Sequence, residues 1–240
     1  MSKRSAVITG AAKRVGHDLA IGLAERGFDI GLNYFHSEKE ATATQKEIEK
    51  LGRQTVLLPG NLADKGIATA LIQKAAEKLS NIELLINNAS IFERAPYLET
   101  DIELYEHNMA LHVQAPFILT AEFAKICKRG NVINIVDTMI NRDSTAYFAY
   151  LLSKKALYEL TKMSAYALAP NIRVNAIAPG STIEPVDEPG SDYVQKRAAQ
   201  VPLKMAGQPS YILQGIDFLL SCPFVTGQCL FIDGGAHIEY

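Results

Sequence analysis

Seven short apolar segments alternate with longer amphipathic stretches along the chain. The short segments are rich in Val, Ile and Leu and show no strict polar alternation, which is typical of strands buried on both faces of a parallel sheet. They cover residues 5–9, 28–33, 54–59, 82–87, 131–136, 172–179 and 229–235. Helices are the usual connections between such strands. The pattern therefore predicts an α/β fold, a doubly wound, seven-stranded parallel sheet with helices on both faces, including long helices around residues 101–128 and 147–169.

The chain is predicted to form a single domain over residues 1–240. We find no Gly/Ser linker, low-complexity run or repeat of 20–50 residues that would divide it. Only the segment at about 181–200 lacks periodicity, and it contains Pro185, Pro189 and Gly190. We expect this segment to form an irregular or mobile lid.

Composition narrows the choice of partners. The 240 residues are 48% hydrophobic and 21% charged, with a formal net charge of −2, so a substantial core is expected and nucleic acid or anionic membranes are not. No apolar run reaches the roughly 20 residues that span a bilayer, and none follows Lys3 and Arg4 as a secretory signal would. Three widely spaced cysteines, Cys127, Cys222 and Cys229, fit reduced thiols and a cytoplasmic location.

Ligands of open parallel sheets bind beyond the carboxyl ends of the strands. The first strand ends at Thr9. Gly10 and two alanines follow it, and then Lys13, Arg14, Val15 and Gly16. Small residues before a helix N-terminus suit a pyrophosphate, although the GxGxxG and GK[ST] patterns are absent and a glycine needed only by the backbone is an equal alternative. Arg14 is either a cation for a phosphate or polar ligand or a solvated surface arginine.

The end of the second strand bears on the choice of cofactor. An acidic residue there would bind a ribose 2′-hydroxyl and repel a 2′-phosphate. Asp29 follows Gly10 by 19 residues, but it lies at the start of the strand. The strand ends in residues 33–37, Asn-Tyr-Phe-His-Ser, without a carboxylate. NADPH is therefore favoured over NADH, and Ser37 is also expected to cap the next helix.

A tyrosine and a lysine at helical spacing supply candidate chemistry. Tyr150 and Lys154 share one face of a predicted helix, so the cation should lower the pKa of the phenol toward working pH and make a general acid. Tyr158 and Lys162 have the same spacing, so the spacing has little specificity by itself. The position of Tyr150, 13 residues after Asp137 at the end of the fifth strand, favours the first pair.

Metal and hydrolase chemistry are not expected. His17, His107 and His237 are scattered without ligand spacing, so no metal site is predicted. The chain also has no GxSxG elbow.

The chain resembles the short-chain dehydrogenase/reductase family over essentially its whole length. The matching residues are Thr9-Gly10 with Gly16, Asn87-Asn88-Ala89, Tyr150 with Lys154, Pro179-Gly180, Thr226-Gly227 and Asp233-Gly234-Gly235. The resemblance implies a Rossmann fold, hydride chemistry and a homotetramer, with the tyrosine moving a proton and the lysine holding the nicotinamide ribose. The implied cofactor residues are Gly10, Arg14, Val15, Asn33, Tyr34, His36, Ser37, Asn61, Leu62, Asn88, Ala89, Ser90, Tyr150, Lys154, Pro179, Gly180 and Ser181.

Departures from the family pattern indicate a subfamily. Arg14 replaces the middle glycine of TGxxxGxG, Asp137 replaces the usual serine, and Ser90 and Phe92 follow the Asn-Asn-Ala sequence. These residues are similar to those of pteridine reductases, which implies that Phe92 stacks on a pterin while Ser90 and Arg14 contact pterin and cofactor. His112 stands where the family has an asparagine of its proton relay. This replacement resembles dihydromonapterin reductases.

The aspartate itself favours reduction of a C=N bond. A serine hydroxyl donates to the alkoxide that develops from a ketone, whereas a carboxylate would repel it. A carboxylate accepts from an N–H group, or donates when protonated, at a C=N bond. Asp137, Tyr150 and Lys154 are therefore the predicted catalytic residues. The alternative for Asp137 is an ordinary strand-end aspartate in an inactive or differently arranged relative.

These observations predict an NADPH-dependent enzyme that reduces a dihydropterin, dihydromonapterin or dihydrofolate to the tetrahydro form, with a small-molecule partner. Two alternatives remain. A carbonyl reductase acting on 3-oxoacyl or steroid-type ketones would keep Tyr150 and give Asp137 a structural role. A non-catalytic regulator would bind NADP and sense its redox state through the segment at 181–200.

Overall fold

The computed structural model describes residues 3–184 and 192–238. Its strands and α-helices, in chain order, are β1 (Arg4–Ile8), α1 (Arg14–Glu25), β2 (Phe28–Tyr34), α2 (Glu38–Lys50), β3 (Thr55–Pro59), α3 (Lys65–Ala76), β4 (Ile82–Asn87), α4 (Ile102–Met109), α5 (Ala115–Cys127), β5 (Gly130–Ile135), α6 (Phe148–Leu168), β6 (Ile172–Pro179), α7 (Tyr193–Ala198), α8 (Pro209–Ser221) and β7 (Cys229–Ile232). Short 3₁₀ turns at Tyr97–Glu99 and Thr138–Asn141 and a π-helical turn at Ala110–Gln114 complete the secondary structure.

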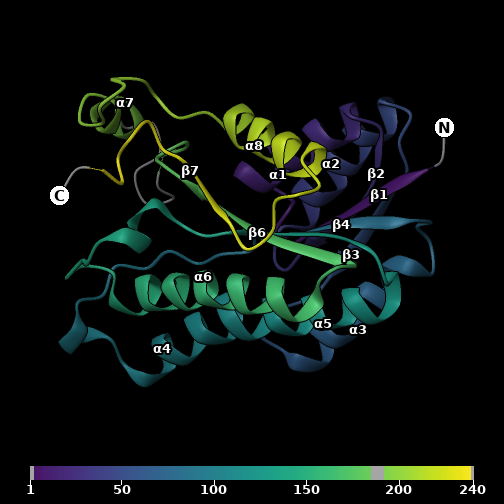
Figure 1. The fold of residues 1–240 in the computed structure, drawn as a ribbon, viewed down its shortest axis with the longest axis horizontal. Helices are drawn as coiled ribbons and strands as arrows, with labels where there is room; N and C mark the ends of the chain where they lie inside the picture. The colour runs from purple at the N-terminus through teal and green to yellow at the C-terminus, as the bar shows by residue number, and fades with distance from the viewer. Residues whose placement is uncertain (1–2, 185–191, 239–240) are drawn as a thin grey trace.

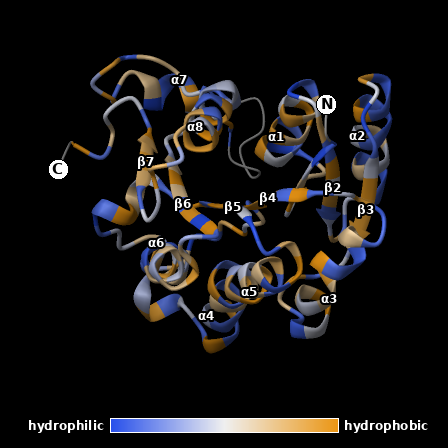
Figure 2. Ribbon diagram, turned by 45° about the vertical axis from the view of Figure 1, so that its right-hand side comes forward, coloured by the Kyte–Doolittle hydropathy of each residue, from blue (hydrophilic) through white to orange (hydrophobic). Residues whose placement is uncertain are grey.

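The seven strands form one parallel sheet in the order β3-β2-β1-β4-β5-β6-β7. Helices α1, α2 and α8 cover one face, and α3, α4, α5 and α6 cover the other (Figures 1 and 2). This arrangement confirms the predicted doubly wound fold and all seven predicted strands. The strand order reverses between β1 and β4, so the ends of these two strands mark the place where such sheets bind ligands.

Burial on both faces of the sheet explains the continuous apolar segments. Ile8 and Ile86 pack in the cluster beneath α1 and α8, whereas Val7 and Leu85, their chain neighbours, pack in the cluster beneath α3 and α5. Successive side chains of a strand point to opposite faces, so every position of these strands meets a helical layer. All four side chains are fully buried.

Two predicted elements differ from the structure. The helix expected over 101–128 is interrupted by the π-helical turn, which separates α4 from α5 and contains the buried His112. Such turns widen a helix by one residue and occur often at functional sites. In the segment at 181–200, residues 185–191 lie outside the described residues, while 193–198 form α7, so the expectation of an irregular segment missed a helix.

Truncation of a fully buried aromatic side chain should test the packing of this core. Phe123 on α5 is fully buried in the cluster with α3, so Phe123→Ala should lower the free energy of unfolding by about 3–5 kcal/mol. Urea denaturation followed by circular dichroism measures this loss. Phe224→Ala is the control, because Phe224 is fully exposed and its removal should change stability by less than about 0.5 kcal/mol. Equal losses in both variants would contradict the assignment.

Candidate active site

The carboxyl ends of β4 and β5 and the first turns of α6 bring the predicted catalytic residues together. Asp137 follows β5, and its Oδ1 accepts a hydrogen bond from the backbone N–H of Met139 at 2.8 Å. Tyr150 lies one turn into α6, and its hydroxyl donates to Oδ2 of Asp137 at 2.7 Å. One carboxylate oxygen is thus fixed by the backbone, and the other faces the phenol.

The pKa of Tyr150 differs from the expectation based on its neighbour Lys154. Burial, the charge of Asp137 and the hydrogen bond to Asp137 raise the pKa of Tyr150 well above its usual value. The expectation that Lys154 lowers this pKa was therefore wrong for this structure, because burial of the phenol, together with the carboxylate bonded to it, raises the pKa instead. Tyr150 remains protonated at neutral pH and is a proton donor.

Lys154 lies on the same face of α6 but turns toward the sheet. Its Nζ donates to the carbonyl oxygen of Ile135 at 2.9 Å and lies 5.7 Å from the centre of the Tyr150 ring. Burial lowers the pKa of Lys154 to about 8 despite the opposing charge of Asp137. The alternative lysine, Lys162, is exposed and bonds Glu159 at the surface. The structure therefore separates the two pairs that sequence spacing left equivalent.

His112, in the π-helical turn, bonds to two other segments of this site, the loop after β4 and helix α6. Its Nε2 accepts from the backbone N–H of Ile91 at 3.1 Å and lies 3.0 Å from the hydroxyl of Ser90. Its Nδ1 lies 2.8 Å from the hydroxyl of Ser153 on α6. That hydroxyl donates its single hydrogen to the carbonyl of Tyr150 at 2.7 Å, so His112 carries its proton on Nδ1. The ring links the loop after β4 to the helix that carries the tyrosine.

His112 is neutral in the folded protein. The side chain is 1% exposed, and burial together with the charge of Lys154 holds the pKa of His112 well below its usual value. A charged ring would have to place a second N–H at Nε2, where Ile91 already donates. The histidine is therefore a neutral connector, both of whose ring nitrogens are bonded.

Phe92 lies beside the tyrosine on the loop after β4. Its ring stacks on Tyr147 with centroids 4.4 Å apart and meets Tyr150 edge to face at 4.8 Å. Phe92 is 46% exposed and borders a cavity of about 430 Å³ that Arg142 and Arg197 also line. An aromatic surface thus faces open space next to the proton donor.

The first turn holds the ends of β1 and β4 together. The hydroxyl of Thr9 accepts from the N–H groups of Asn88 and Ala89 at 2.8 and 2.9 Å, while the amide of Asn88 donates to the carbonyls of Thr9 and Gly10. A Cβ on Gly16 would lie 2.1 Å from the carbonyl oxygen of Gly10. Only glycine fits that position, which keeps the N-terminus of α1 close to the strand end.

Most of the chain, residues 10–237, matches the family model for enoyl-(acyl carrier protein) reductase. The chain belongs to the short-chain dehydrogenase/reductase family.

Relatives of several activities in this family resemble the chain. It is 26% identical over 248 residues to L-rhamnose 1-dehydrogenase (NAD(P)(+)) of Sphingomonas sp., with 98% of this chain and 97% of the relative covered. It is 28% identical to the 3-oxoacyl-[acyl-carrier-protein] reductase FabG of Staphylococcus aureus, with 98% of each covered. The crystal structure of FolM alternative dihydrofolate reductase 1 from Brucella canis, complexed with NADP, matches with a TM-score of 0.90 and 30% identity over 100% of this chain and 96% of the other.

These similarities establish an NAD(P)-dependent oxidoreductase of the short-chain dehydrogenase/reductase family with a small-molecule substrate.

The residues of the first turn fit the dinucleotide cofactor of this family. The first turn of α1 contains no acidic side chain, so the partial positive charge of the helix N-terminus is not neutralised there. Gly10 has a φ of +61° and packs against Ala89. A Cβ added to Gly10 would lie 2.9 Å from the Cα of Ala89. The turn before α1 is therefore lined by small side chains and leaves room for the phosphates of a dinucleotide.

Arg14 is the first residue of α1 and has a φ of +59°. This conformation favours glycine, the residue expected here from the pattern of the short-chain dehydrogenase/reductase family. Its Nη2 donates to the carbonyl of Glu184 at 2.6 Å. The side chain thus crosses from the first turn to the segment after β6. Its predicted contact with pterin or cofactor stays a prediction.

The predicted cofactor residues after β2 take different positions. Asn33 is buried, accepts from the N–H of Gly10 at 3.2 Å and donates to the carbonyls of Leu58 and Gly60. Its amide supports the turn, and its contact with a cofactor stays a prediction. Tyr34 is also buried, whereas His36 is exposed. Asp29 accepts from the N–H of Gln54, far from the site, as expected for a residue at the start of its strand.

The structure also places four more of the predicted cofactor residues. Ser37 stands at the N-cap of α2, but its side chain makes no capping hydrogen bond, which corrects that expectation. Asn61 accepts from the N–H of Ala63 at 3.0 Å. The side chain of Leu62 is buried in the core, so only its backbone remains available to a ligand. Val15 is half-buried and packs against the core beside α1.

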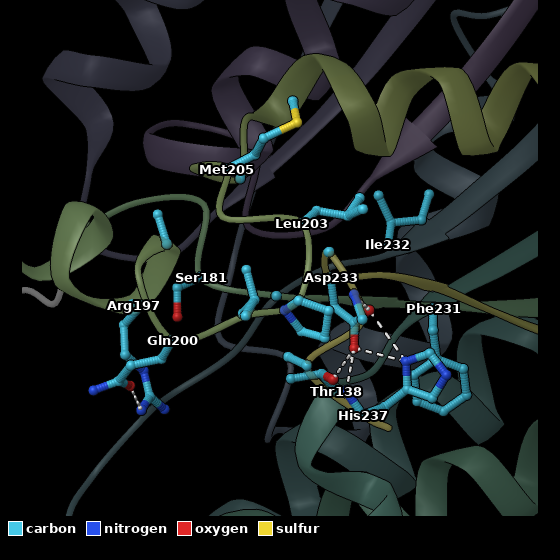
Figure 3. A pocket seen from close by; sticks show the side chains of 18 of the residues that line it. Thr138, Ser181, Arg197, Gln200, Leu203, Met205, Phe231, Ile232, Asp233 and His237 are labelled. Atoms are coloured by element: carbon cyan, nitrogen blue, oxygen red, sulfur yellow. Dashed lines mark hydrogen bonds and ion pairs between the residues drawn. The ribbon is translucent and has the colours of Figure 1, made fainter. Parts of the chain in front are cut away.

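A larger cavity of about 730 Å³ lies beside the ends of β6 and β7 (Figure 3). Gly180 and Ser181, which follow Pro179, line it, whereas Asp137 and Tyr150 do not. Asp233 at its centre accepts hydrogen bonds from the hydroxyl of Thr138 and from the backbone of His237 (Figure 3). Although burial acts to raise the pKa of Asp233, these bonds hold it below its usual value.

Within the described residues, no group of three or more His, Cys, Asp or Glu side chains is placed to hold a metal ion. Over the same residues, no helix has the length and apolar character needed to cross a membrane. Cys127, Cys222 and Cys229 are free and half-buried, and burial raises the pKa of Cys127 to about 11.

The neutrality of His112 should make the fold acid-sensitive. The unfolded chain protonates this histidine near pH 6.5 and the folded chain does not, so falling pH favours unfolding. The free energy of unfolding of the wild type, relative to His112→Asn, should fall by about 1 kcal/mol between pH 7.5 and 5.5. Urea titrations at several pH values measure this difference. His36→Asn, at an exposed position, is the control, and parallel pH curves for wild type and His112→Asn would refute the neutral state.

Proposed function

We propose that this protein is an NADPH-dependent reductase of the C=N bond of a dihydropterin or dihydrofolate. The hydrogen bond between Tyr150 and Asp137 carries the proposal. A carboxylate beside the proton donor would repel the alkoxide formed from a ketone, but it can hold an N–H group of a heterocycle. Ser90, Phe92 and Arg14 are proposed to contact the substrate. The FolM neighbour, at 30% identity, supports this choice of substrate class.

Each residue has a defined part in the proposed reaction. Tyr150, kept protonated by its raised pKa, gives a proton to the ring nitrogen. Asp137 holds the phenol and orients the substrate N–H, while the exposed ring of Phe92 packs on the heterocycle. Lys154 holds the nicotinamide ribose. Bound NADPH supplies the hydride that reaches the carbon next to that nitrogen.

The preference for NADPH rests on the end of β2. Residues 33–37 contain no carboxylate that would repel a 2′-phosphate. The solved FolM neighbour is complexed with NADP, which is consistent with this choice. The remaining predicted cofactor residues, on the first turn and after β3, β4 and β6, surround the same edge of the sheet.

We also propose a homotetramer, which rests on resemblance and on exposed apolar side chains. On α5 and α6, Phe117 is 59%, Met163 70% and Tyr166 92% exposed. Apolar side chains gathered on helical surfaces are typical of contacts between subunits.

A second candidate, reduction of a carbonyl group, is favoured by the 28% identity to FabG.

The two candidates are distinguished by following the oxidation of NADPH with dihydrobiopterin, dihydromonapterin, dihydrofolate and a 3-oxoacyl thioester. We expect turnover of the pterins and its loss by about 100-fold in Asp137→Ser, because the serine cannot hold the ring N–H as a carboxylate does. Inactivity toward every pterin, or ketone turnover that survives Asp137→Ala, would favour the second candidate.

Removal of the Tyr150 hydroxyl should abolish most of the turnover. Tyr150→Phe deletes the proton donor, so kcat should fall by about 100-fold or more. Steady-state kinetics with NADPH and dihydropterin measure this effect. Tyr158→Phe is the matched control, because it removes a hydroxyl from the same helix outside the site. Near-normal turnover in Tyr150→Phe would rule out its role as general acid.

A further inference from the structure

Two arginines from separate elements meet at the cavity beside Phe92. Arg142 follows the 3₁₀ turn after Asp137, and Arg197 lies on α7. Both line the cavity of about 430 Å³ together with Phe92 and Tyr147, and both also line the larger cavity. They therefore stand where the two spaces adjoin, on the open side of the Phe92 ring.

Among the described residues, neither arginine forms an ion pair with a carboxylate. Within the described residues, the guanidinium of Arg142 makes no hydrogen bond or ion pair. That of Arg197 donates to the neutral side-chain oxygen of Gln200 at 3.1 Å. Asp143 is the acid on the wall of the smaller cavity, and it points to solvent, where Lys155 binds it at 2.6 Å. Of the described side chains that line the smaller cavity, two are cationic and one is anionic, and the anionic one is already bonded to Lys155.

The position of the arginines determines which part of a bound substrate could reach them. Phe92 lines the smaller cavity, and the centre of its ring lies 4.8 Å from that of Tyr150. A heterocycle that is protonated by Tyr150 and packs on Phe92 would direct its substituent into this cavity. Half-buried guanidinium groups with free donors bind carboxylates better than hydroxyl groups, because the hydrogen bonds are charge-assisted.

We propose that the substrate carries a carboxylate on the substituent of its reducible ring, and that Arg142 and Arg197 bind this carboxylate. The inference rests on the proposed function and narrows it to folate-type substrates, whose aminobenzoyl-glutamate substituent is anionic, in preference to pterins with a short neutral side chain.

The kinetic test compares two substrates that share the ring. We measure kcat/KM for dihydrofolate and for dihydrobiopterin with NADPH, in the wild type, Arg142→Gln and Arg197→Gln. The ratio of the two values should favour dihydrofolate in the wild type and fall by about tenfold in each variant, because a charge-assisted hydrogen bond is lost. The wild-type ratio should also fall as salt is raised from about 0.05 to 0.5 M, because ions screen the attraction.

Arg129→Gln is the matched control. It removes the same charge next to the start of β5, at the opposite edge of the sheet, and should leave the ratio unchanged. If both substrates are reduced and the ratio is unaffected by the cavity variants and by salt, the carboxylate site is refuted while the reductase function stands.

A binding measurement tests the arginines even if neither substrate is reduced. Calorimetry with 4-aminobenzoyl-L-glutamate should detect binding to the wild type, weakened by about tenfold in Arg142→Gln, and none for 4-aminobenzamide, which lacks the carboxylates. If neither substrate is reduced but the fragment binds in this way, the reductase proposal fails and the anion site holds. Absence of fragment binding, or equal binding to wild type and variants, overturns the anion site.

Discussion

The hydrogen bond from the Tyr150 phenol to the Asp137 carboxylate is the interaction on which the site depends. If both groups were ionised, two negative charges would lie 2.7 Å apart and repel each other strongly. The pair therefore retains a proton, and the backbone N–H of Met139 fixes the carboxylate that shares it. In the proposed reaction the phenol therefore gives up its proton only when the acceptor becomes strongly basic, as a ring nitrogen does when a hydride reaches the neighbouring carbon.

The neutral histidine shows how the family scaffold accommodates a different residue in its helical layer. The π-helical turn places His112 so that one ring nitrogen bonds Ser153 and the other accepts from Ile91. The loop that carries Phe92 and the helix that carries Tyr150 are thereby fixed to the same ring. Positions of the aromatic surface and of the proton donor are consequently coupled, although the histidine itself takes no charge.

The sequence predicted the layers, the strands and the helical face that Tyr150 and Lys154 share, because strand burial and helical spacing are local patterns. It did not predict the pKa of Tyr150, since that value depends on which charge the fold brings to the hydroxyl, and Asp137 is 13 residues away in the chain. Ser153 carries no sequence signal of its role, because its partner His112 is 41 residues distant. Arg142 and Arg197 are likewise ordinary in sequence, and only folding places them on one cavity.

The bond from Thr138 to Asp233 joins the residue next to Asp137 to one that is 95 positions further along the chain. During synthesis, a nascent chain that has finished β5 still lacks this acceptor. Thr138 can form this bond only after β6, α8 and β7 have emerged from the ribosome. The last contact that fixes the turn beside Asp137 is thus a late event in biogenesis.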